Sequence, residues 1–418
     1  MVNIFWVSLK SLKILIMIYL FIFLILLGYK MVFFSIFYGW SHGDTYEYFR
    51  IAKHILYLDF YEYMLKRTLG FPLFIALGGL NSKIIVIYQM LLGIAIALIV
   101  FYLIYDITKS RYISLFTSIL LGTYIQSTHL EFGMLTETLC YFLLTLHILL
   151  IYKFFKTDKT LYIILASFVC GYLIIVKLNF IPTFISLIIS IVYKRKFSKS
   201  LILTTTLISL MPLTINLFIN YINAKKFKVY GYTGYSLLTH IANFPQCIGD
   251  YEIREKIRNR NFSVFWVWDI KWSKSEEEIR KIAIEAITKC PYYYFLSSFG
   301  SFLKFFFPRK TIETFSIERH KTNFRKGYYR FKTLIDKVWE YQIYLNWFLN
   351  FLFFLILIFH RKSDLFSNVL SINILSNAIF QAFFIFGDNW RYGYPFLSSI
   401  VIYVVKNGYE FFKFFKRV

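Results

Sequence analysis

Charged residues are scarce in this sequence. They make up 17% of its 418 residues, whereas a soluble domain carries roughly a quarter. The deficit is concentrated in long apolar runs such as 14–28, 84–105 and 351–359. A hydrocarbon core about 30 Å thick needs roughly 20 apolar residues per helix, so these runs exclude the soluble globular class. We expect an all-α polytopic membrane protein.

Cysteine is also rare, and its pattern carries no metal signature. The chain has 4 cysteines, with no CxxC pair and no Cys/His cluster at zinc-finger spacing. Cys140 and Cys170 fall in apolar runs and are predicted to be small packing residues. Cys247 and Cys290 share one long polar stretch. They could be bridged in an oxidising compartment, but the sequence gives no distance between them.

The N-terminus lacks the small-residue cleavage pattern of a signal peptide. Lys10 and Lys13 precede an apolar run that continues to about Ser35, so we interpret the run as a first, uncleaved spanning helix. No internal repeat or low-complexity linker divides the rest of the chain. Residues 1–418 are therefore predicted to form a single membrane-embedded domain.

Acidic residues are outnumbered, and the net charge is +24. In a soluble protein this excess would suggest nucleic-acid binding. Here much of it lies in short connections between apolar runs, where Lys and Arg set the orientation of the chain in the membrane. We expect contacts with membrane lipids and no nucleic-acid partner.

The basic connections indicate one topology. With ten crossings, the basic groups at 109–111, 153–159, 194–199, 361–362 and 406–417 all fall on the face of the N-terminus. The bias of Lys and Arg then makes this face, and both termini, cytoplasmic. The ten segments predicted to cross are 12–36, 84–105, 112–126, 134–152, 161–176, 180–193, 201–220, 342–359, 365–386 and 393–405.

Two large external segments remain, at 38–83 and 221–341. In the second, Ser275 is followed three residues later by Glu278, the spacing of a capping box. This pattern predicts an amphipathic helix over 275–289.

Residues 291–308 are apolar enough to span the membrane. A crossing there would move every later basic cluster to the external face, so we expect an interfacial or re-entrant helix instead. The recurrence of Phe299, Phe302, Phe305 and Phe306 at helical spacing agrees with an interfacial helix.

The first external segment carries the clearest candidate residue for chemistry. Asp44 lies just beyond the first spanning segment, at the expected lipid–water boundary, and Tyr46 and Tyr48 follow it on a predicted helix. A carboxylate here can act as a general base toward an acceptor hydroxyl or can anchor a metal ion. The alternative is a helix N-cap, since Asp at a helix start accepts backbone N–H bonds.

Three cations at the same face are candidates for binding an anion. Lys66 and Arg67 are adjacent and suit a phosphate or pyrophosphate ligand, although they could equally contact ordinary anionic headgroups. Lys177 lies between two apolar runs. Its alternative explanation is snorkelling of the amine to the membrane surface.

A second carboxylate is a candidate for catalysis. Glu137 lies at the edge of an apolar run, where an ionisable group is costly and indicates a functional site. Capping of the helix that begins there is the alternative. His42, His129, Glu131 and His240 are also predicted to be external, so a divalent-metal site could be assembled with Asp44, but the spacing does not require one.

The stretch GDNWRYGYP places Asp388, Arg391 and Tyr392 in a short turn between the last two spanning segments. An Arg in a short external turn runs against the orientation bias. It therefore indicates an anionic partner.

Together these stretches resemble a family of membrane glycosyltransferases. GDTYEYFRIAKHIL is similar to the first-loop motif of the dolichyl-phosphate-mannose protein mannosyltransferases, the GT-C fold class, which includes lipid A aminoarabinose transferase-like bacterial enzymes. KRTLGFPLFIAL resembles the stretch written R-x-P-G-x-P-L, with Leu69 in place of the first Pro. LTETLCYFLL resembles an S-E-T-L segment, 177–182 an R-P-T-like turn with Lys177 in place of Arg, and WRYGYPFL a late R-Y-x-x-P motif.

The resemblance implies transfer of a sugar from a polyprenyl-phosphate carrier to a lipid, glycan or protein acceptor at the external face of a prokaryotic cytoplasmic membrane. Asp44 would be the base, with Glu137 as the second catalytic carboxylate. Tyr46, Lys66, Arg67, Lys177, Arg391 and Tyr392 would bind substrate, the cations by stabilising the leaving phosphate. Trp266, Trp268 and Trp272 would stack on sugars or isoprenoid, unless they only anchor the chain at the interface.

Other functions remain open. A flippase for lipid-linked sugars, or another transporter, would place ionisable groups near the bilayer midplane, where the apolar segments have almost no Asp, Glu or Arg. A polysaccharide polymerase or ligase would share the carrier and the location but lacks the first-loop Asp pattern. A non-catalytic assembly protein is a further alternative.

Overall fold

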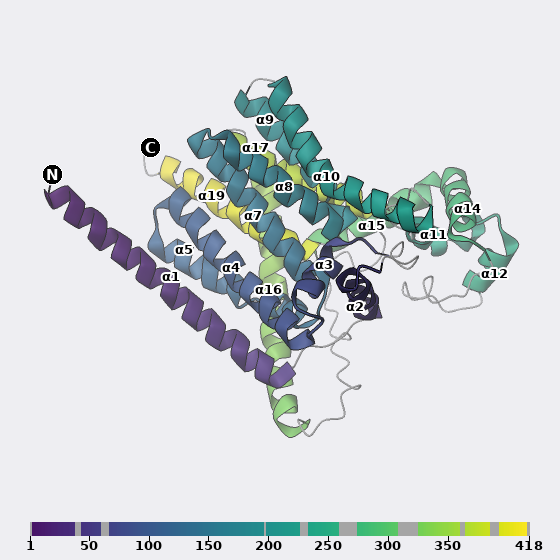
Figure 1. The fold of residues 1–418 in the computed structure, drawn as a ribbon, viewed down its shortest axis with the longest axis horizontal. Helices are drawn as coiled ribbons and strands as arrows, with labels where there is room; N and C mark the ends of the chain where they lie inside the picture. The colour runs from purple at the N-terminus through teal and green to yellow at the C-terminus, as the bar shows by residue number, and fades with distance from the viewer. Residues whose placement is uncertain are drawn as a thin grey trace.

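The computed structural model describes residues 2–37, 43–59, 67–195, 198–225, 233–258, 274–307, 325–359, 364–384 and 393–415. These residues form helices joined by short turns and contain no strand. Figure 1 shows a bundle of long helices, with a group of shorter helices beyond its right-hand side. The all-α prediction is confirmed.

Seven segments in the described part of the chain are long and apolar enough to cross a membrane. They lie in α1 (Val2–Phe37), α4 (Ser82–Thr108), α7 (Thr136–Thr157), α9 (Thr183–Arg195) with the preceding short turn of helix η2 (Leu178–Phe180), α10 (Lys199–Ala224), α16 (Arg325–Phe359) and α17 (Leu365–Phe384). The chain is thus a polytopic membrane protein. The other three predicted segments fall in α5 (Arg111–Gly122) and α8 (Thr160–Val176), which are shorter, and in α19 (Leu397–Phe415), which contains Lys406, Glu410 and Lys413.

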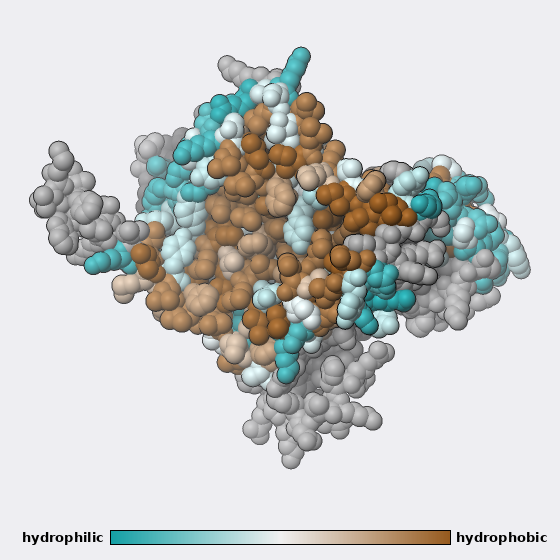
Figure 2. Space-filling model, viewed as in Figure 1, coloured by the Kyte–Doolittle hydropathy of each residue, from teal (hydrophilic) through white to brown (hydrophobic). Residues whose placement is uncertain are grey.

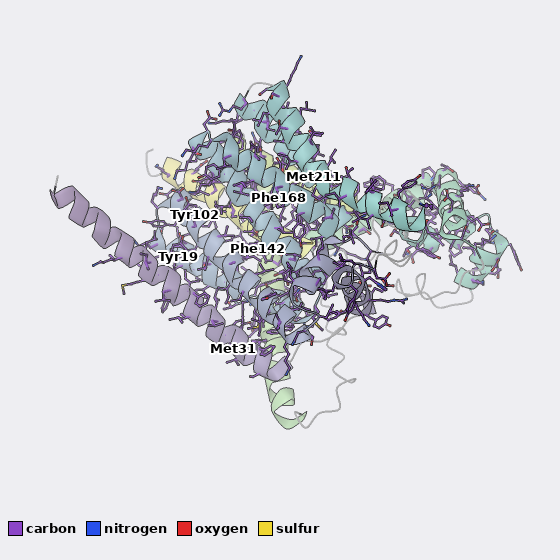
Figure 3. All side chains as sticks on the ribbon, viewed as in Figure 1. Tyr19, Met31, Tyr102, Phe142, Phe168 and Met211 are labelled. Carbon is purple, nitrogen blue, oxygen red and sulfur yellow. A yellow bond between two sulfur atoms is a disulfide. The ribbon has the colours of Figure 1, made fainter. Side chains whose placement is uncertain are left out.

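The outer surface of the bundle is apolar. Met31 on α1, Phe168 on α8 and Met211 on α10 are 50%, 60% and 60% exposed, and Figure 3 labels each of them. Figure 2 shows the same property as a broad hydrophobic region across the centre of the molecule, with hydrophilic residues at its upper left edge and at its right-hand end. A contiguous apolar surface of this kind marks a face that meets lipid.

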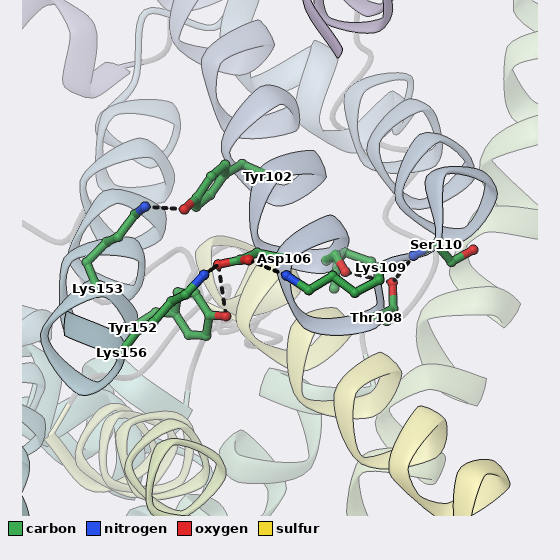
Figure 4. Close-up of polar contacts among 9 residues, drawn as sticks. Tyr102, Asp106, Thr108, Lys109, Ser110, Tyr152, Lys153 and Lys156 are labelled. Atoms are coloured by element: carbon green, nitrogen blue, oxygen red, sulfur yellow. Dashed lines mark hydrogen bonds and ion pairs between the residues drawn. The ribbon is translucent and has the colours of Figure 1, made fainter. Parts of the chain in front are cut away.

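The described parts of the predicted basic connections gather at one end of the bundle, whereas 361–362 lies outside the described residues. Asp106 of α4 binds Lys109 at 2.7 Å and also contacts Lys156 of α7, so the ends of these helices meet (Figure 4). Arg195 lies 3.3 Å from Asp158, which follows α7 directly. The rings of Tyr152 and Phe366 meet at 5.2 Å, and Lys406 lies 2.9 Å from Asp364, which attaches α17 and α19 to the same end. Figure 1 shows both chain termini on the left-hand side of the molecule.

Three helices at the opposite end form a small hydrophobic core of their own. They are α11 (Thr233–Ala242), α12 (Tyr251–Arg258) and α14 (Glu276–Lys289), and the core includes Leu238, Ile241, Ile253, Ile279 and Ala283. We call this group the outer subdomain.

Two features of the outer subdomain bear on the sequence analysis. A disulfide joins Cys247 to Cys290. The sequence alone did not show whether these two cysteines are bridged. The capping box is confirmed, because Ser275 and Glu278 bond reciprocally at the start of α14. By contrast, Cys140 and Cys170 are free and buried, as expected for packing residues.

The segment 291–308 contains a helix, α15 (Pro291–Phe306). Tyr294 donates its hydroxyl to the carbonyl of Phe383 on α17. Phe305 packs on Phe396 at 5.4 Å, and Phe306 packs on Phe353 of α16 at 6.1 Å. A helix is therefore present here and links the outer subdomain to the bundle, whereas its interfacial or re-entrant placement stays a prediction.

Candidate functional site at the outer ends of the helices

Helix α2 (Gly43–Leu56) positions the first candidate carboxylate. Asp44 lies in its first turn, where a negative charge is favoured by the unpaired N–H groups of the helix start. Tyr48 and Ala52 are buried on one side of α2, whereas Tyr46 is 71% exposed. The helix therefore lies with one face against the bundle and presents the other outward.

Arg67 joins two carboxylates of α2. Its Nη2 atom donates to Oδ1 of Asp44 at 2.6 Å, and its Nε atom donates to Oε2 of Glu47 at 2.7 Å. The guanidinium also lies over the ring of Tyr48, 5.4 Å from the centroid. Sequence analysis missed Glu47, although its spacing of three residues from Asp44 puts both carboxylates on one helix face.

The residues after Arg67 lie against the end of α8. Thr68 donates its hydroxyl to the carbonyl of Val176 at 3.4 Å, and Tyr172 donates to the carbonyl of Gly70 at 3.0 Å. A Cβ atom at Gly70, the first residue of α3 (Gly70–Leu77), would lie 2.5 Å from the backbone nitrogen of Val176. Only glycine allows this approach, which brings the segment of Arg67 beside that of Lys177.

Lys177 forms a second ion pair. Its Nζ atom lies 3.1 Å from Oε1 of Glu137, whose side chain is 1% exposed. Lys177 follows α8 in an extended conformation, and Glu137 is in the first turn of α7. The N-cap of α7 is Leu135, which has no capping side chain. The contact with Glu137 gives Lys177 a defined partner that snorkelling alone would not provide.

A third ion pair is fully buried. Lys30 of α1 donates to both carboxylate oxygens of Glu131 at 2.6 Å, and neither side chain is exposed. Glu131 lies in α6 (Ile125–Phe132) and accepts a further bond from Ser127 at 3.1 Å. A Cβ atom at Gly93 would lie 2.1 Å from Oε1 of Glu131, so the carboxylate fills the space left by that glycine. Sequence analysis missed Lys30, although a Lys inside an apolar segment is a signal in itself.

Several predicted site residues lie outside the residues that the structure describes. They are Lys66, Arg391 and Tyr392, together with Asp388, His42, Trp266, Trp268 and Trp272. The described part of the chain brings together Asp44, Arg67, Lys177 and Glu137. Tyr46, two residues after Asp44 on α2, lines a depression of about 700 Å³ with Arg50, Lys53 and His54.

Within the described ranges, no three His, Cys, Asp or Glu side chains gather as they would around a metal ion. Two of the proposed ligands in these ranges pack against aromatic rings. His129 packs near the ring of Trp339 at 6.1 Å, and His240 near the ring of Tyr294 at 5.4 Å.

No protein-family model, no curated protein and no solved structure matches this chain.

Proposed function

We propose that this protein transfers a sugar from a polyprenyl-phosphate carrier to an acceptor at the outer membrane face, as its resemblance to GT-C glycosyltransferases implies. The observation that carries the proposal is the pairing of Arg67 with Asp44 and Glu47, next to the pair of Lys177 with Glu137. Carboxylates and cations held together near a lipid boundary suit a reaction that removes a proton and releases a phosphate.

The proposed reaction is an inverting displacement. The acceptor oxygen forms a bond to the anomeric carbon of the sugar while the bond between that carbon and the carrier phosphate breaks. The acceptor proton passes to the carboxylate of Asp44, and the electron pair of the broken bond stays on the polyprenyl phosphate. In this scheme Arg67 positions Asp44 and Glu47. Lys177 stabilises the charge that develops on the leaving phosphate.

The remaining predicted residues have supporting roles in the proposal. Lys66 and Arg391 would contribute further positive charge toward the phosphate, and Tyr46 and Tyr392 would contact the sugar or the acceptor. Glu137 would hold the amine of Lys177 or, as the runner-up to Asp44, accept the proton itself.

The finer topology also belongs to the proposal. We infer ten crossings, with α5, α8 and α19 joining the seven long apolar segments, and cytoplasmic termini. The collection of the basic connections at one end of the bundle supports this orientation. The disulfide between Cys247 and Cys290 at the other end supports it independently, because disulfides persist in oxidising compartments.

A transporter of lipid-linked sugars is the second candidate. The buried pair of Lys30 and Glu131 favours it, because ionisable groups enclosed between apolar helices often line ion or substrate pathways. Transport would move the intact carrier lipid across the bilayer with no acceptor present, whereas sugar transfer would release free polyprenyl phosphate.

The deciding experiment uses the purified full chain in proteoliposomes with a polyprenyl-phosphate sugar. Asp44→Asn should lower acceptor-dependent release of polyprenyl phosphate by about 10²–10⁴-fold, the contribution typical of a general base. The thermal midpoint should stay close to that of the unmodified chain. Asp158→Asn is the matched control, since Asp158 pairs with Arg195 at the opposite end of the bundle.

Other outcomes would redirect the proposal. Full activity in Asp44→Asn together with loss of activity in Glu137→Gln would move the base to α7. Movement of intact carrier across the bilayer, with no release of free phosphate under any condition, would replace the transferase by the transporter.

A further inference from the structure

A lateral groove opens on the lipid-facing surface at the end of the bundle that holds the termini. It has a volume of about 890 Å³, within the range of about 300–1,000 Å³ typical of small-molecule sites. Its walls are the last turns of α16 and α19 and the start of α5, including Leu352, Ile356, Phe359, Val405, Phe412 and Ile113. The described residues proposed for sugar transfer lie elsewhere.

Apolar walls alone would not select a ligand inside a membrane. A bilayer is as apolar as Leu and Phe side chains, so the groove gains little from burying a hydrocarbon chain that was already in lipid. Selection must therefore come from the shape of the groove and from charge at its rim.

The rim carries positive charge. Lys413 lines the groove at the end of α19. Its side chain is exposed, and it has no ion-pair partner within the ranges that the structure describes. Nearby cations, by contrast, form ion pairs. Lys109 and Lys156 share Asp106 (Figure 4), and Lys406 contacts both Asp364 and Glu410.

Gly408 leaves the groove open. It lines the groove, and a Cβ atom built on it would meet no other atom within 4 Å. A larger side chain at this position would therefore extend into the groove without displacing the helices around it.

We propose that this groove binds one acyl chain of an anionic phospholipid from the leaflet on the side of the termini. The chain lies between α16 and α19, and the phosphate lies against Lys413. Charge complementarity selects the anionic lipid over a zwitterionic one, since each Lys or Arg near the surface adds to the attraction of anionic headgroups. This inference does not depend on the proposed sugar transfer.

The test uses the full chain in nanodiscs of equal parts palmitoyl-oleoyl phosphatidylglycerol and phosphatidylcholine. Native mass spectrometry after release counts the lipids that stay bound. The unmodified chain should retain phosphatidylglycerol in excess. Lys413→Gln should lower that preference about five-fold, the effect expected of one Lys near an anionic surface. Gly408→Phe should remove most of the retained lipid of both kinds.

Matched controls separate the groove from general effects. Gly28 lies on α1, and a Cβ atom placed on it would likewise meet nothing within 4 Å, so Gly28→Phe should retain the same lipid as the unmodified chain. Lys109→Gln removes a cation that is already paired, and it should leave the preference unchanged.

Three results would overturn the proposal. The first is equal retention of the two lipids by the unmodified chain. The second is unchanged retention in Gly408→Phe. The third is a lipid-free dimer that Gly408→Phe converts to a monomer, which would assign the groove to contact between two copies. If Gly408→Phe does not fold, Lys413→Gln alone still decides the charge selection.

Discussion

Two carboxylates in this protein each pair with a cation, one in a buried and one in a partly exposed environment. Glu131 and its partner Lys30 are both fully buried; they meet at 2.6 Å, and Ser127 donates a further hydrogen bond to Glu131. Asp44 and its partner Arg67 also meet at 2.6 Å, but their side chains are 32% and 19% exposed. Two ion pairs with the same separation therefore differ in exposure: Lys30–Glu131 is closed to solvent, and Arg67–Asp44 is partly open to it.

The difference in burial indicates a structural role for the pair of Lys30 and Glu131 and is compatible with the chemical role proposed for Asp44. Removing one partner of a buried pair leaves a charge without water or counterion, which is strongly destabilising. A partly exposed pair is screened by water and contributes little to stability. Asp44 and Arg67 are partly open to solvent, as the proposed sugar transfer requires. The pair of Lys30 and Glu131 instead fastens α1 to α6, so reactivity is expected at the first site and stability at the second.

The largest stability effect is expected at the buried pair. Lys30→Met should lower the free energy of unfolding by about 3–5 kcal/mol, because Glu131 would remain buried without its cation. Thermal unfolding of the purified chain in detergent, followed by intrinsic fluorescence, measures this loss. The double variant Lys30→Met with Glu131→Gln should recover much of it. A single variant as stable as the unmodified chain would contradict the structural role.

An intermediate effect is expected at Lys177, where one partner is buried and the other is partly exposed. Lys177→Met removes the cation 3.1 Å from Glu137 and should cost about 1.5–3 kcal/mol, the range for a hydrogen bond to a charged group. The same unfolding measurement applies. Glu137→Gln in the Lys177→Met background tests the pairing, since it should cost less there than in the unmodified chain. Equal costs in both backgrounds would show that the two residues do not interact.

A smaller stability effect and a larger functional effect are expected at Arg67. Arg67→Gln should cost about 1 kcal/mol or less, as for other solvent-accessible ion pairs. It should nevertheless impair sugar transfer strongly, because Asp44 and Glu47 would lose the group that fixes their orientation. Comparing thermal midpoints and release of polyprenyl phosphate in one preparation checks both parts. A large loss of stability with normal transfer would reverse the assigned roles of the two sites.

The sequence predicted the features that depend on local patterns. Hydropathy located ten segments that largely coincide with helices, and loop charge predicted that their basic connections share one end. The capping box of Ser275 and Glu278 is equally local, since both residues lie within one turn of the same helix. Such signals need no knowledge of distant contacts.

The missed features depend on contacts between distant parts of the chain. Lys30 and Glu131 are 101 residues apart, and no local pattern pairs them. The disulfide could not be predicted for the same reason: Cys247 and Cys290 are separated by 43 positions. Glu47 differs, since its position three residues after Asp44 was visible in the sequence. The placement of Arg67 beside Lys177 required the close approach that Gly70 allows between α3 and α8.

The smallest effect on stability is expected at an ion pair of the outer subdomain, a third setting to compare with the buried and the partly exposed pairs of the bundle. Lys274 lies 2.8 Å from Asp250. Burial tends to raise the pKa of Asp250, but the hydrogen bonds from Lys274 and from the backbone of Ile253 outweigh it and lower that pKa. The backbone N–H of Ser275 lowers the pKa of Glu278, and the hydrogen bond to Asp250 raises the pKa of Lys274.

These directions fix the pH dependence. Groups whose pKa is lowered on folding stabilise the folded state fully above their unfolded values of about 4, and the stabilisation is lost as pH falls through the folded values. The raised pKa of Lys274 acts in the opposite sense. Its contribution is complete below about pH 10.4 and is lost as pH rises through the folded value. Burial also lowers the pKa of His240 on α11 to about 3, so that only the unfolded chain takes up this proton and stability falls below about pH 6.5. The stability of the subdomain should therefore be flat between about pH 7.5 and 9, with a further loss as the carboxylates take up protons below about pH 4.

Hydrogen exchange of α14, with the disulfide kept oxidised, measures this local stability. The unmodified chain and Glu278→Gln should be compared at each pH, so that the intrinsic dependence of exchange on pH cancels. Protection of α14 should differ between them at pH 6, and the difference should shrink toward pH 3 as the carboxylates take up protons. Lys30→Met should not change this profile, because its pair lies in the bundle. A difference between the two chains that grows as pH falls would mean that Glu278 stabilises α14 in its protonated form.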